Sequence, residues 1–251
     1  MDSRQCYVAR HPGRVLLREQ LTRLVADLGG TGKTAEVMVT RADVAGPLSH
    51  LVLRTEPKGC LAYCIEGALR LECVSDAGAN RIVSLAAAEE FIPRPASLCR
   101  RGYRVRMSPH ESATMATWSP AALREILLTV PESGMLKFLD RTQLGWTPHR
   151  ERWAILSMLE APERIAVVLG DLVARFGVPH EAGVQITVPL VDRHIAALIG
   201  TNRERVNRCL NALIRERLVR RLPNRRLWVS HAFLGQTRGT TSAGTATSAP
   251  S

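Results

Sequence analysis

The spacing of apolar positions first predicts a β-rich N-terminal part. From Glu36 to Trp118, short alternating apolar runs are separated by turn residues, which is the pattern of an antiparallel β-roll. The predicted strands are 37–39, 51–53, 60–65, 68–74, 81–85, 103–107 and 113–118. Gly67 and the segment 76–80 supply turn residues between neighbouring strands. A helix is predicted before the first strand, at 16–28.

Helical spacing follows the β-roll. Apolar residues recur at intervals of three and four from Pro120 to Leu159. Pro148 interrupts this stretch, and a proline inside a helix removes a hydrogen bond and clashes with the preceding turn. Thr147 is placed to cap a helix that restarts at Pro148. We therefore expect a long connecting helix that is kinked or broken at Pro148.

Two short amphipathic helices joined at Gly200 follow. Ile195 and Ile199 are four residues apart on the first helix, and apolar positions on the second repeat at intervals of four and three: Val206, Leu210 and Leu213. Gly200 suits the left-handed position past a helix end. Thr201 or Asn202 is suited to cap the next helix. The segment therefore predicts a helix-turn-helix.

The remaining face of the second helix carries four polar side chains, Arg203, Glu204, Asn207 and Arg208. A helix-turn-helix places its second helix in the major groove of DNA, where arginine pairs with guanine and glutamate accepts from cytosine. The alternative is an ordinary solvated face with a Glu204–Arg208 pair. We interpret the four residues as a double-stranded DNA-binding set.

Charge supports this interpretation. The 251 residues carry a net charge of +11, and the nine Arg and two Glu between Gly200 and His231 supply +7 of it. A local basic footprint is what phosphate neutralisation requires. Within it, apolar residues flank a Pro223-Asn224 turn, which predicts a small hairpin wing. Arg225, beside this turn, joins the candidate DNA-binding residues.

The segment Leu190–Arg208, followed by Leu210-x-x-Leu213 and a basic hairpin, resembles the winged-helix signature of the CRP/FNR family of bacterial transcription regulators. The resemblance covers 162–229. It implies that Arg203, Glu204 and Arg208 contact base edges and that Asn202 contacts a phosphate. Asn207 stands at a position associated with half-site preference, and a half-site containing TG and A is the expected operator.

The resemblance also implies a fold class: α+β, with an N-terminal antiparallel β-roll of the cyclic-nucleotide-binding type, a dimerisation helix and a C-terminal winged helix-turn-helix. We expect a homodimer on an inverted repeat, with activity modulated through movement of the dimer helices. Val191 and His194 depart from the family pattern, which has a Ser or Thr cap and an acidic residue there. Asp192 is expected to cap instead, and His194 is given no function.

The family's cyclic-nucleotide cassette is missing. Phe91 is followed by Ile-Pro-Arg-Pro rather than Gly-Glu, and the later basic run lacks Arg-Ser. The sequence argues against cyclic AMP and leaves the effector or cofactor unknown. The arginines in this region are interpreted as a solvated face rather than an anion site: Arg94, Arg100, Arg101 and Arg104.

Two alternatives stay open. A redox- or haem-sensing regulator of the same fold would use some of the six cysteines or seven histidines, although Cys60 and Cys64 fit buried core thiols better. An NTPase would use Gly32-Lys33-Thr34, but Asp27 replaces the first glycine, and the segment joins a helix to a strand rather than the reverse. We expect no catalytic or metal site.

The sequence predicts four parts. They are a sensor β-roll with its N-terminal helix at 1–118, a helical connector at 119–161, the winged helix-turn-helix at 162–234 and a disordered Thr/Ser/Gly/Ala tail at 235–251. The chain lacks an apolar stretch long enough to span a membrane, and no Cys-x-x-Cys pair or secretory signal is present. A cytoplasmic location is expected, and RNA polymerase is left open as a partner.

Overall fold

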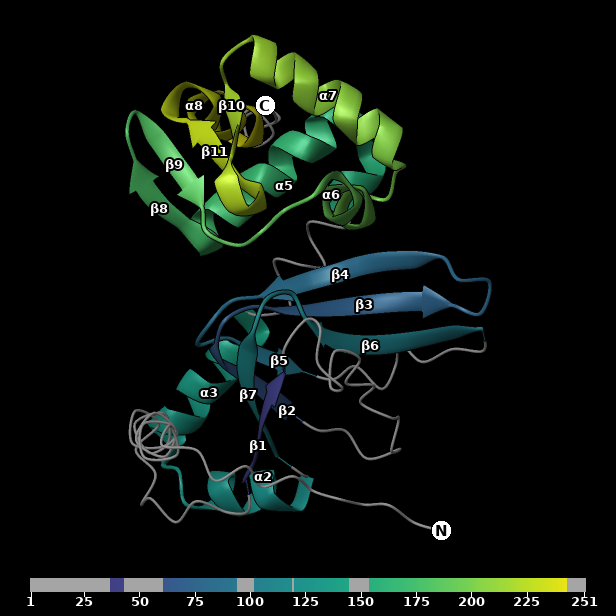
Figure 1. The fold of residues 1–251 in the computed structure, drawn as a ribbon. Helices are drawn as coiled ribbons and strands as arrows, with labels where there is room; N and C mark the ends of the chain where they lie inside the picture. Colours follow the sequence, from purple (N-terminus) through teal and green to yellow (C-terminus); the bar gives the residue numbers. More distant parts are fainter. Residues whose placement is uncertain (1–36, 43–60, 94–101, 119, 145–153, 243–251) are drawn as a thin grey trace, which may run out of the picture.

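The computed structural model describes residues 37–42, 61–93, 102–118, 120–144 and 154–242. They form a β-roll with two helices against it and, at the other end, a winged-helix domain (Figure 1). The predicted helix at 16–28, the predicted strand at 51–53, the Gly32-Lys33-Thr34 segment and Pro148 lie outside the described residues.

The β-roll consists of two antiparallel sheets. The first sheet has the order β1 (Val37–Ala42), β7 (Ala113–Trp118), β2 (Leu61–Glu66), β5 (Phe91–Pro93). The second has the order β4 (Asn80–Ala86), β3 (Leu69–Ser75), β6 (Tyr103–Pro109). Strand β7 is buried at every position, because it lies between β1 and β2 and both its faces are covered. The antiparallel β-roll is confirmed, with β5 added to the predicted strands.

The turn between β2 and β3 requires glycine. Gly67 has a φ of 77°, in the left-handed region. A Cβ at this position would lie 2.1 Å from the carbonyl oxygen of Ser112, so the strand end leaves no room for a side chain. The turn predicted at Gly67 is therefore confirmed.

Two helices cover the first sheet. Helices α2 (Pro120–Leu128) and α3 (Glu132–Leu144) contribute Ile126 and Phe138 to an apolar cluster with Leu61, Tyr63, Ile65, Phe91, Ala116 and Trp118 of the sheet. The rings of Phe91 and Phe138 are 5.6 Å apart and meet edge to face. On the opposite face of α3, Leu136 and Leu139 are 59% and 44% exposed.

The winged-helix domain surrounds helix α5. Its elements are α5 (Ala161–Phe176), β8 (Gly177–His180), β9 (Gly183–Ile186), α6 (Asp192–Ile199), α7 (Arg203–Arg215), β10 (Val219–Leu222), β11 (Arg226–Ser230) and α8 (His231–Ser242). The four strands pair in the order β10-β11-β9-β8. Buried residues of α5, α6, α7 and the sheet form one core: Ile165, Leu169, Leu172, Ile195, Leu198, Val206, Leu210 and Leu227.

At three places the structure shows more than the sequence predicted or differs from it. The hairpin β8–β9 was not predicted, because each strand has only four residues and alternation over so short a run is weak. Residues 235–242, which were expected to belong to a disordered tail, are helical, since α8 continues to Ser242. The break expected at Pro148 lies outside the described residues, but the helical stretch is also interrupted between α2 and α3 and at Glu160, whose backbone is extended before α5 begins.

The β-roll and the winged helix share buried apolar surface. Ala68, Ile82 and Leu85 of the β-roll belong to the same apolar cluster as the core of the winged helix. Helix α6 lies over strand β4, while α7 lies on the side of the domain away from the β-roll (Figure 1). The helix-turn-helix thus packs against the second sheet of the β-roll through α6.

Candidate DNA-binding surface

The turn between α6 and α7 has the geometry expected of a helix-turn-helix. Gly200 ends α6 with a φ of 74°, and its N–H donates to the carbonyl of Ala196. Asn202 caps α7 by accepting a hydrogen bond of 2.9 Å from the N–H of Arg205 through Oδ1. The left-handed glycine and the side-chain cap, assigned here to Asn202 rather than Thr201, confirm the predicted turn.

Helix α7 separates an apolar face from a polar one. Val206 and Leu210 are fully buried against α5 and α6, because their spacing of four places them on one side of the helix. Arg203, Glu204 and Arg208 are exposed. Within the described part of the chain, none of these three side chains makes a hydrogen bond or salt bridge. They are therefore available to contact another molecule.

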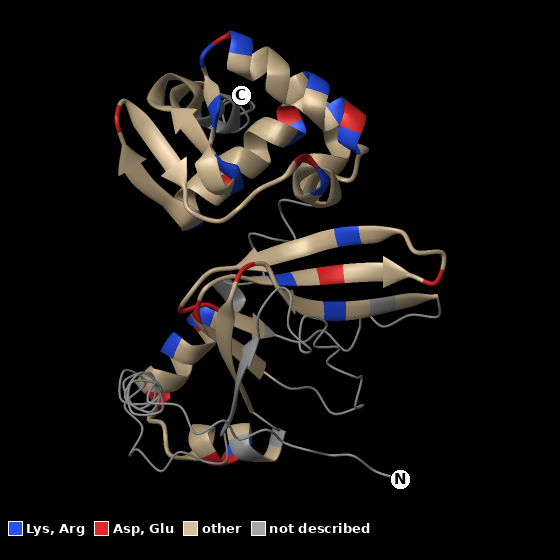
Figure 2. Cartoon of the chain, in the orientation of Figure 1, with Lys and Arg blue, Asp and Glu red and all other residues tan. Residues whose placement is uncertain are grey.

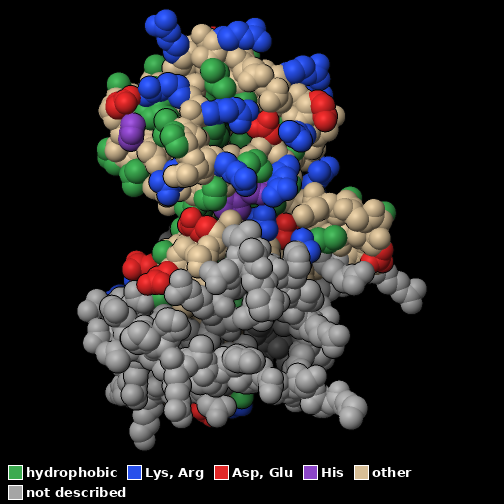
Figure 3. Space-filling view, in the orientation of Figure 1, with side chains coloured by type: hydrophobic (Ala, Val, Ile, Leu, Met, Phe, Trp, Pro, Cys, Tyr) green, Lys and Arg blue, Asp and Glu red, His purple; other side chains and the backbone are tan. Residues whose placement is uncertain are grey.

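Basic side chains gather on the winged-helix domain. Helix α7 carries four arginines, Arg203, Arg205, Arg208 and Arg215, and one acidic residue, Glu204 (Figure 2). The space-filling view shows that basic side chains are spread over the surface of this domain (Figure 3). Among the arginines of α7, Arg205 is paired within the protein, since it forms a 3.0 Å salt bridge with Glu160 just before α5.

Asn207 differs from the other predicted base-contacting residues. Its Nδ2 donates to Asp192 Oδ2 at 2.9 Å, and its Oδ1 accepts from Asn211 Nδ2 at 2.9 Å. Both its amide nitrogen and its oxygen are therefore already hydrogen-bonded to other residues of the protein, at its surface. Asn207 therefore lies on the same helix as Arg203, Glu204 and Arg208, but unlike them it is already hydrogen-bonded within the protein.

The predicted wing is present. Strands β10 and β11 pair in antiparallel fashion around the turn Pro223–Arg225. Asn224 and Arg225 both have positive φ angles, 59° and 62°, and asparagine tolerates this region better than most residues. The carbonyl of Arg225 accepts from the N–H of Leu190 at 2.7 Å, which ties the wing to the start of the helix-turn-helix. The side chain of Arg225 is exposed.

Sequence reasoning missed the role of Asp192. It does not cap α6: Val191 occupies the cap position and makes no side-chain cap. The Asp192 carboxylate instead accepts from Asn207 and, at 2.8 Å, from Arg221 of β10. Burial raises the pKa of this carboxyl, but the hydrogen bonds from Asn207 and Arg221 and the charges of Arg221 and Arg203 outweigh it and leave the pKa below its ordinary value.

An arginine of the winged helix binds to the β-roll. Arg175 of α5 donates from Nε to Glu90 Oε1 at 2.9 Å, and its Nη2 contacts Glu90 Oε2 and the carbonyl of Leu85. Its side chain is only 15% exposed, so this charge-assisted contact is partly desolvated. Arg175 therefore fixes α5 relative to strands β4 and β5.

Two histidines meet where α6 faces the β-roll. His110 Nε2 lies 2.6 Å from the carbonyl oxygen of Pro189, which can only accept, so Nε2 carries the proton. His194 Nε2 lies 3.3 Å from Arg70 Nη1, which can only donate, so this nitrogen carries none. The two rings are 4.7 Å apart. The hydrogen-bond partners at this interface therefore suit two neutral imidazoles.

Burial is the main reason that both histidines resist protonation. It lowers the pKa of His110 to about 4, and the positive charge of Arg70 acts in the same direction. It also lowers the pKa of His194 to about 3, with added repulsion from His110, Arg70 and Arg193. Glu72 lies nearby, but Arg106 Nε at 3.1 Å and Ser108 Oγ at 2.7 Å already engage its carboxylate. His194 is therefore an interface residue.

Cys64 lacks the properties of a sensor thiol. Cys64 is buried and donates to the carbonyls of Glu66 and Gly67, and burial together with Glu90 and Glu111 raises the pKa of its thiol to about 12. Such a thiol stays protonated and is a poor nucleophile. No group of three potential metal ligands occurs among the described residues. Cys60, Arg94 and the segment after it, where a nucleotide cassette would lie, are outside that part.

A membrane-spanning helix is also not found: none of the helices described is both long enough and apolar enough to cross a bilayer.

Sequence comparison identifies the C-terminal domain. Residues 163–232 match the Crp-like helix-turn-helix domain, and this range contains α6, α7 and the wing. No curated protein sequence matches the chain. The matched range agrees with the winged-helix region expected from the sequence, which began at residue 162.

Solved structures extend the similarity to the β-roll. FixK2 from Bradyrhizobium japonicum is 15% identical, with a TM-score of 0.62, and the match covers 85% of this chain and 99% of FixK2. TTHB099, a CRP-family transcriptional regulator from Thermus thermophilus, is 21% identical, with a TM-score of 0.60 and coverage of 84% and 100%. CLP, a c-di-GMP responsive global regulator from Xanthomonas campestris, is 17% identical, with a TM-score of 0.59 and coverage of 84% and 98%. The chain therefore carries a Crp-like helix-turn-helix domain and has the fold of the CRP/FNR-type DNA-binding transcription regulators.

Proposed function

We propose that this protein binds an inverted-repeat DNA operator as a homodimer and that its β-roll modulates this binding. The observation that supports it most is the trio of Arg203, Glu204 and Arg208. These side chains are exposed, make no hydrogen bond or salt bridge within the described chain, and occupy the first turns of a helix that a left-handed glycine and an asparagine cap hold in place.

The chemistry of these residues suits base recognition in the major groove. Arginine donates two hydrogen bonds to guanine O6 and N7, and glutamate accepts from the amino group of cytosine. Asn202 uses Oδ1 for its cap and keeps its amide protons for a phosphate oxygen. The unpaired N–H groups at the start of α7 also favour an anion. We assign Thr201 and Arg225 to backbone contacts on either side of this helix.

An exposed apolar surface on the β-roll helices suits a second copy of the chain. Leu136 and Leu139 of α3 are 59% and 44% exposed, and Leu128 at the end of α2 is 76% exposed. Exposed large apolar side chains on one helix face suit an interface. A two-fold axis through this region would present two copies of α7 to successive turns of DNA.

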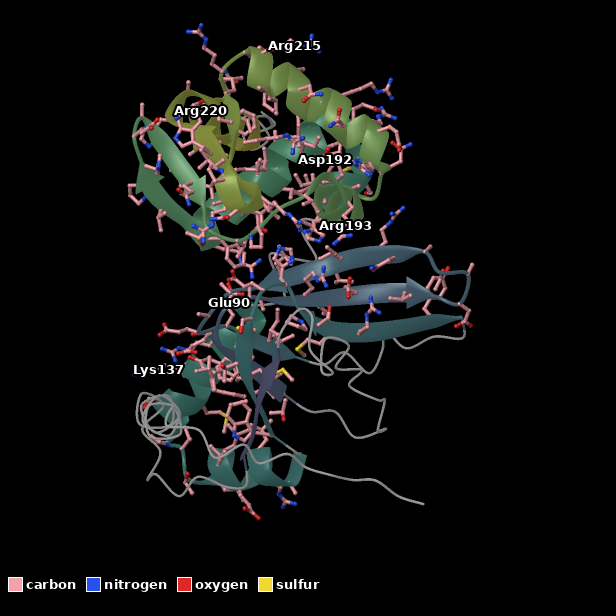
Figure 4. The ribbon with its side chains drawn as sticks, viewed as in Figure 1. Glu90, Lys137, Asp192, Arg193, Arg215 and Arg220 are labelled. Atoms are coloured by element: carbon pink, nitrogen blue, oxygen red, sulfur yellow. The ribbon has the colours of Figure 1, made fainter. Side chains whose placement is uncertain are left out.

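The dimer can be tested on α3. Replacing both Leu136 and Leu139 with glutamate is expected to turn the dimer into a monomer at micromolar concentration, because two charges would be buried at the interface. Sedimentation equilibrium measures the change. Lys137→Glu, on the same helix (Figure 4), is the control and should remain dimeric. If the double leucine variant keeps the mass of a dimer, the dimer interface does not include Leu136 and Leu139.

Control of DNA binding by the β-roll is the finer part of the proposal. CLP, whose fold this chain shares, is described as responsive to c-di-GMP. Here the winged helix rests on the second sheet through Arg175, the two histidines and shared apolar residues. A change in this sheet would therefore reach α6 directly.

Sequence-specific binding is tested by capturing genomic DNA fragments with the purified protein and sequencing them. The wild type is expected to enrich an inverted repeat. A Glu204→Ala/Arg208→Ala variant, assayed at the same salt concentration, should capture DNA without enriching a motif. Equal motif-free capture by both proteins would show that the basic residues bind phosphates only, and the proposal would fail.

A further inference from the structure

Asp192 connects three elements of the DNA-binding surface. It lies in the first turn of α6 and accepts from Asn207 in the middle of α7 and from Arg221 on β10. The Asp192 side chain is 11% exposed, whereas that of Arg221 is 39% exposed. Figure 4 shows Asp192 between α6 and α7. A single carboxylate thus joins the first helix, the second helix and the wing.

The hydrogen bonds also fix the orientation of Asn207. A carboxylate can only accept, so the amide nitrogen of Asn207 faces Asp192 and its oxygen is left to accept from Asn211. This arrangement occupies one donor and one acceptor of the carboxamide. Arg203, Glu204 and Arg208 carry no such internal bonds within the described residues.

A carboxylate is an unexpected group at this place. Phosphates repel negative charge, so an acidic residue that does not contact a base weakens DNA binding unless it is neutralised. Arg221 neutralises Asp192 at 2.8 Å. Any contribution of Asp192 to DNA recognition therefore comes from how it positions its neighbours and not from its charge.

We propose that Asp192 is a positioning residue for base recognition: through Asn207 and Arg221 it holds the second helix against the first helix and the wing, so that Arg203, Glu204 and Arg208 meet their bases in register. Asn207 is then a link in this connection rather than a base-contacting group. The inference rests on the proposed function, because it concerns how the same surface discriminates between sequences.

The test measures selectivity, defined as the dissociation constant for scrambled DNA divided by that for the operator selected by the wild type. Asp192→Ala is expected to lower selectivity about tenfold, the loss of one good base contact, while affinity for scrambled DNA stays equal or rises because a negative charge is removed. Asp192→Asn keeps an acceptor for Asn207 and should restore part of the selectivity.

Glu181→Ala is the matched control. Glu181 is also a carboxylate, it also pairs with an arginine of β10, and it makes no hydrogen bond or salt bridge with α7 in the described structure. Its removal should raise affinity for scrambled DNA in the same way and leave selectivity unchanged. A thermal melt of each variant shows whether it is folded, and a purely structural role for Asp192 would lower both affinities in parallel.

A variant of Asn207 shows whether this residue links Asp192 to α7 or contacts a base directly. If Asn207 is a link, Asn207→Ala lowers selectivity as Asp192→Ala does, and the double variant is no worse than either single one. The inference is overturned if Asp192→Ala keeps wild-type selectivity, or if Asn207→Ala relaxes preference at one base position and Asp192→Ala does not. If the wild type itself selects no motif, the proposed function fails first and the inference falls with it.

Discussion

Arg208→Ala lowers affinity for the selected operator by about 10- to 100-fold, because one good bidentate pair with a base is worth about 1–3 kcal/mol. Arg208 is exposed on α7 and is not held by another described side chain, so its removal leaves the fold intact. Affinity for scrambled DNA should change by less than about threefold, since only one of many positive charges is lost. Fluorescence anisotropy with both DNAs at one salt concentration measures the two constants.

Arg215 provides the control for this prediction. It is also an exposed arginine of α7 but is the last residue of that helix, away from the Gly200 turn (Figure 4). Arg215→Ala removes the same charge and should lower both affinities slightly and equally. If Arg208→Ala behaved like Arg215→Ala, Arg208 would be a phosphate contact, and base recognition would have to be assigned to other residues.

The second large effect concerns acid. Lowering the pH from 7.5 to 5 is expected to reduce the free energy of unfolding by about 2 kcal/mol through His110 alone. Burial lowers the pKa of His110 from its ordinary 6.5 to about 4 in the folded protein. Below pH 6.5 the unfolded chain therefore binds a proton that the folded chain excludes. The stabilisation is complete above pH 6.5 and is lost as the pH falls toward 4.

His194 acts in the same direction, because burial lowers its pKa to about 3. The groups that face the pair are Arg70 and Glu72 of β3, Arg193 of α6 and the carbonyl of Pro189. A proton on His194 Nε2 would point at the Arg70 guanidinium. Acid is therefore expected to weaken the contact between the β-roll and the winged helix before it affects either core.

Urea unfolding between pH 5 and 7.5 checks this dependence. His110→Gln places an amide N–H near the carbonyl of Pro189 and cannot take up a proton in this range, so its stability should vary less with pH than that of the wild type. His231→Gln, at an exposed histidine, is the control for replacing a histidine with glutamine. A wild-type slope retained in His110→Gln would assign the pH dependence to other groups.

The sequence by itself determined the elements that depend on neighbouring residues. Val206 and Leu210 predicted the buried face of α7 from their spacing, and Gly200 and Asn202 predicted its beginning from their backbone and capping preferences. Alternating runs predicted most strands of the β-roll, and Gly67 predicted a turn that admits no side chain. The helix-turn-helix resemblance, confirmed over 163–232, rested on the same local signals.

The tertiary structure alone decided the contacts between distant residues. Asp192 looked like a cap, but its partners are Asn207 and Arg221, the second of them 29 positions away. His194 had no assigned role until Arg70, 124 positions away, was found against its ring. Hydrophobic periodicity records which side of an element is buried, because burial repeats with the turn of the helix or the alternation of the strand. It does not record which distant polar group faces which, because that pairing depends on how the elements are brought together.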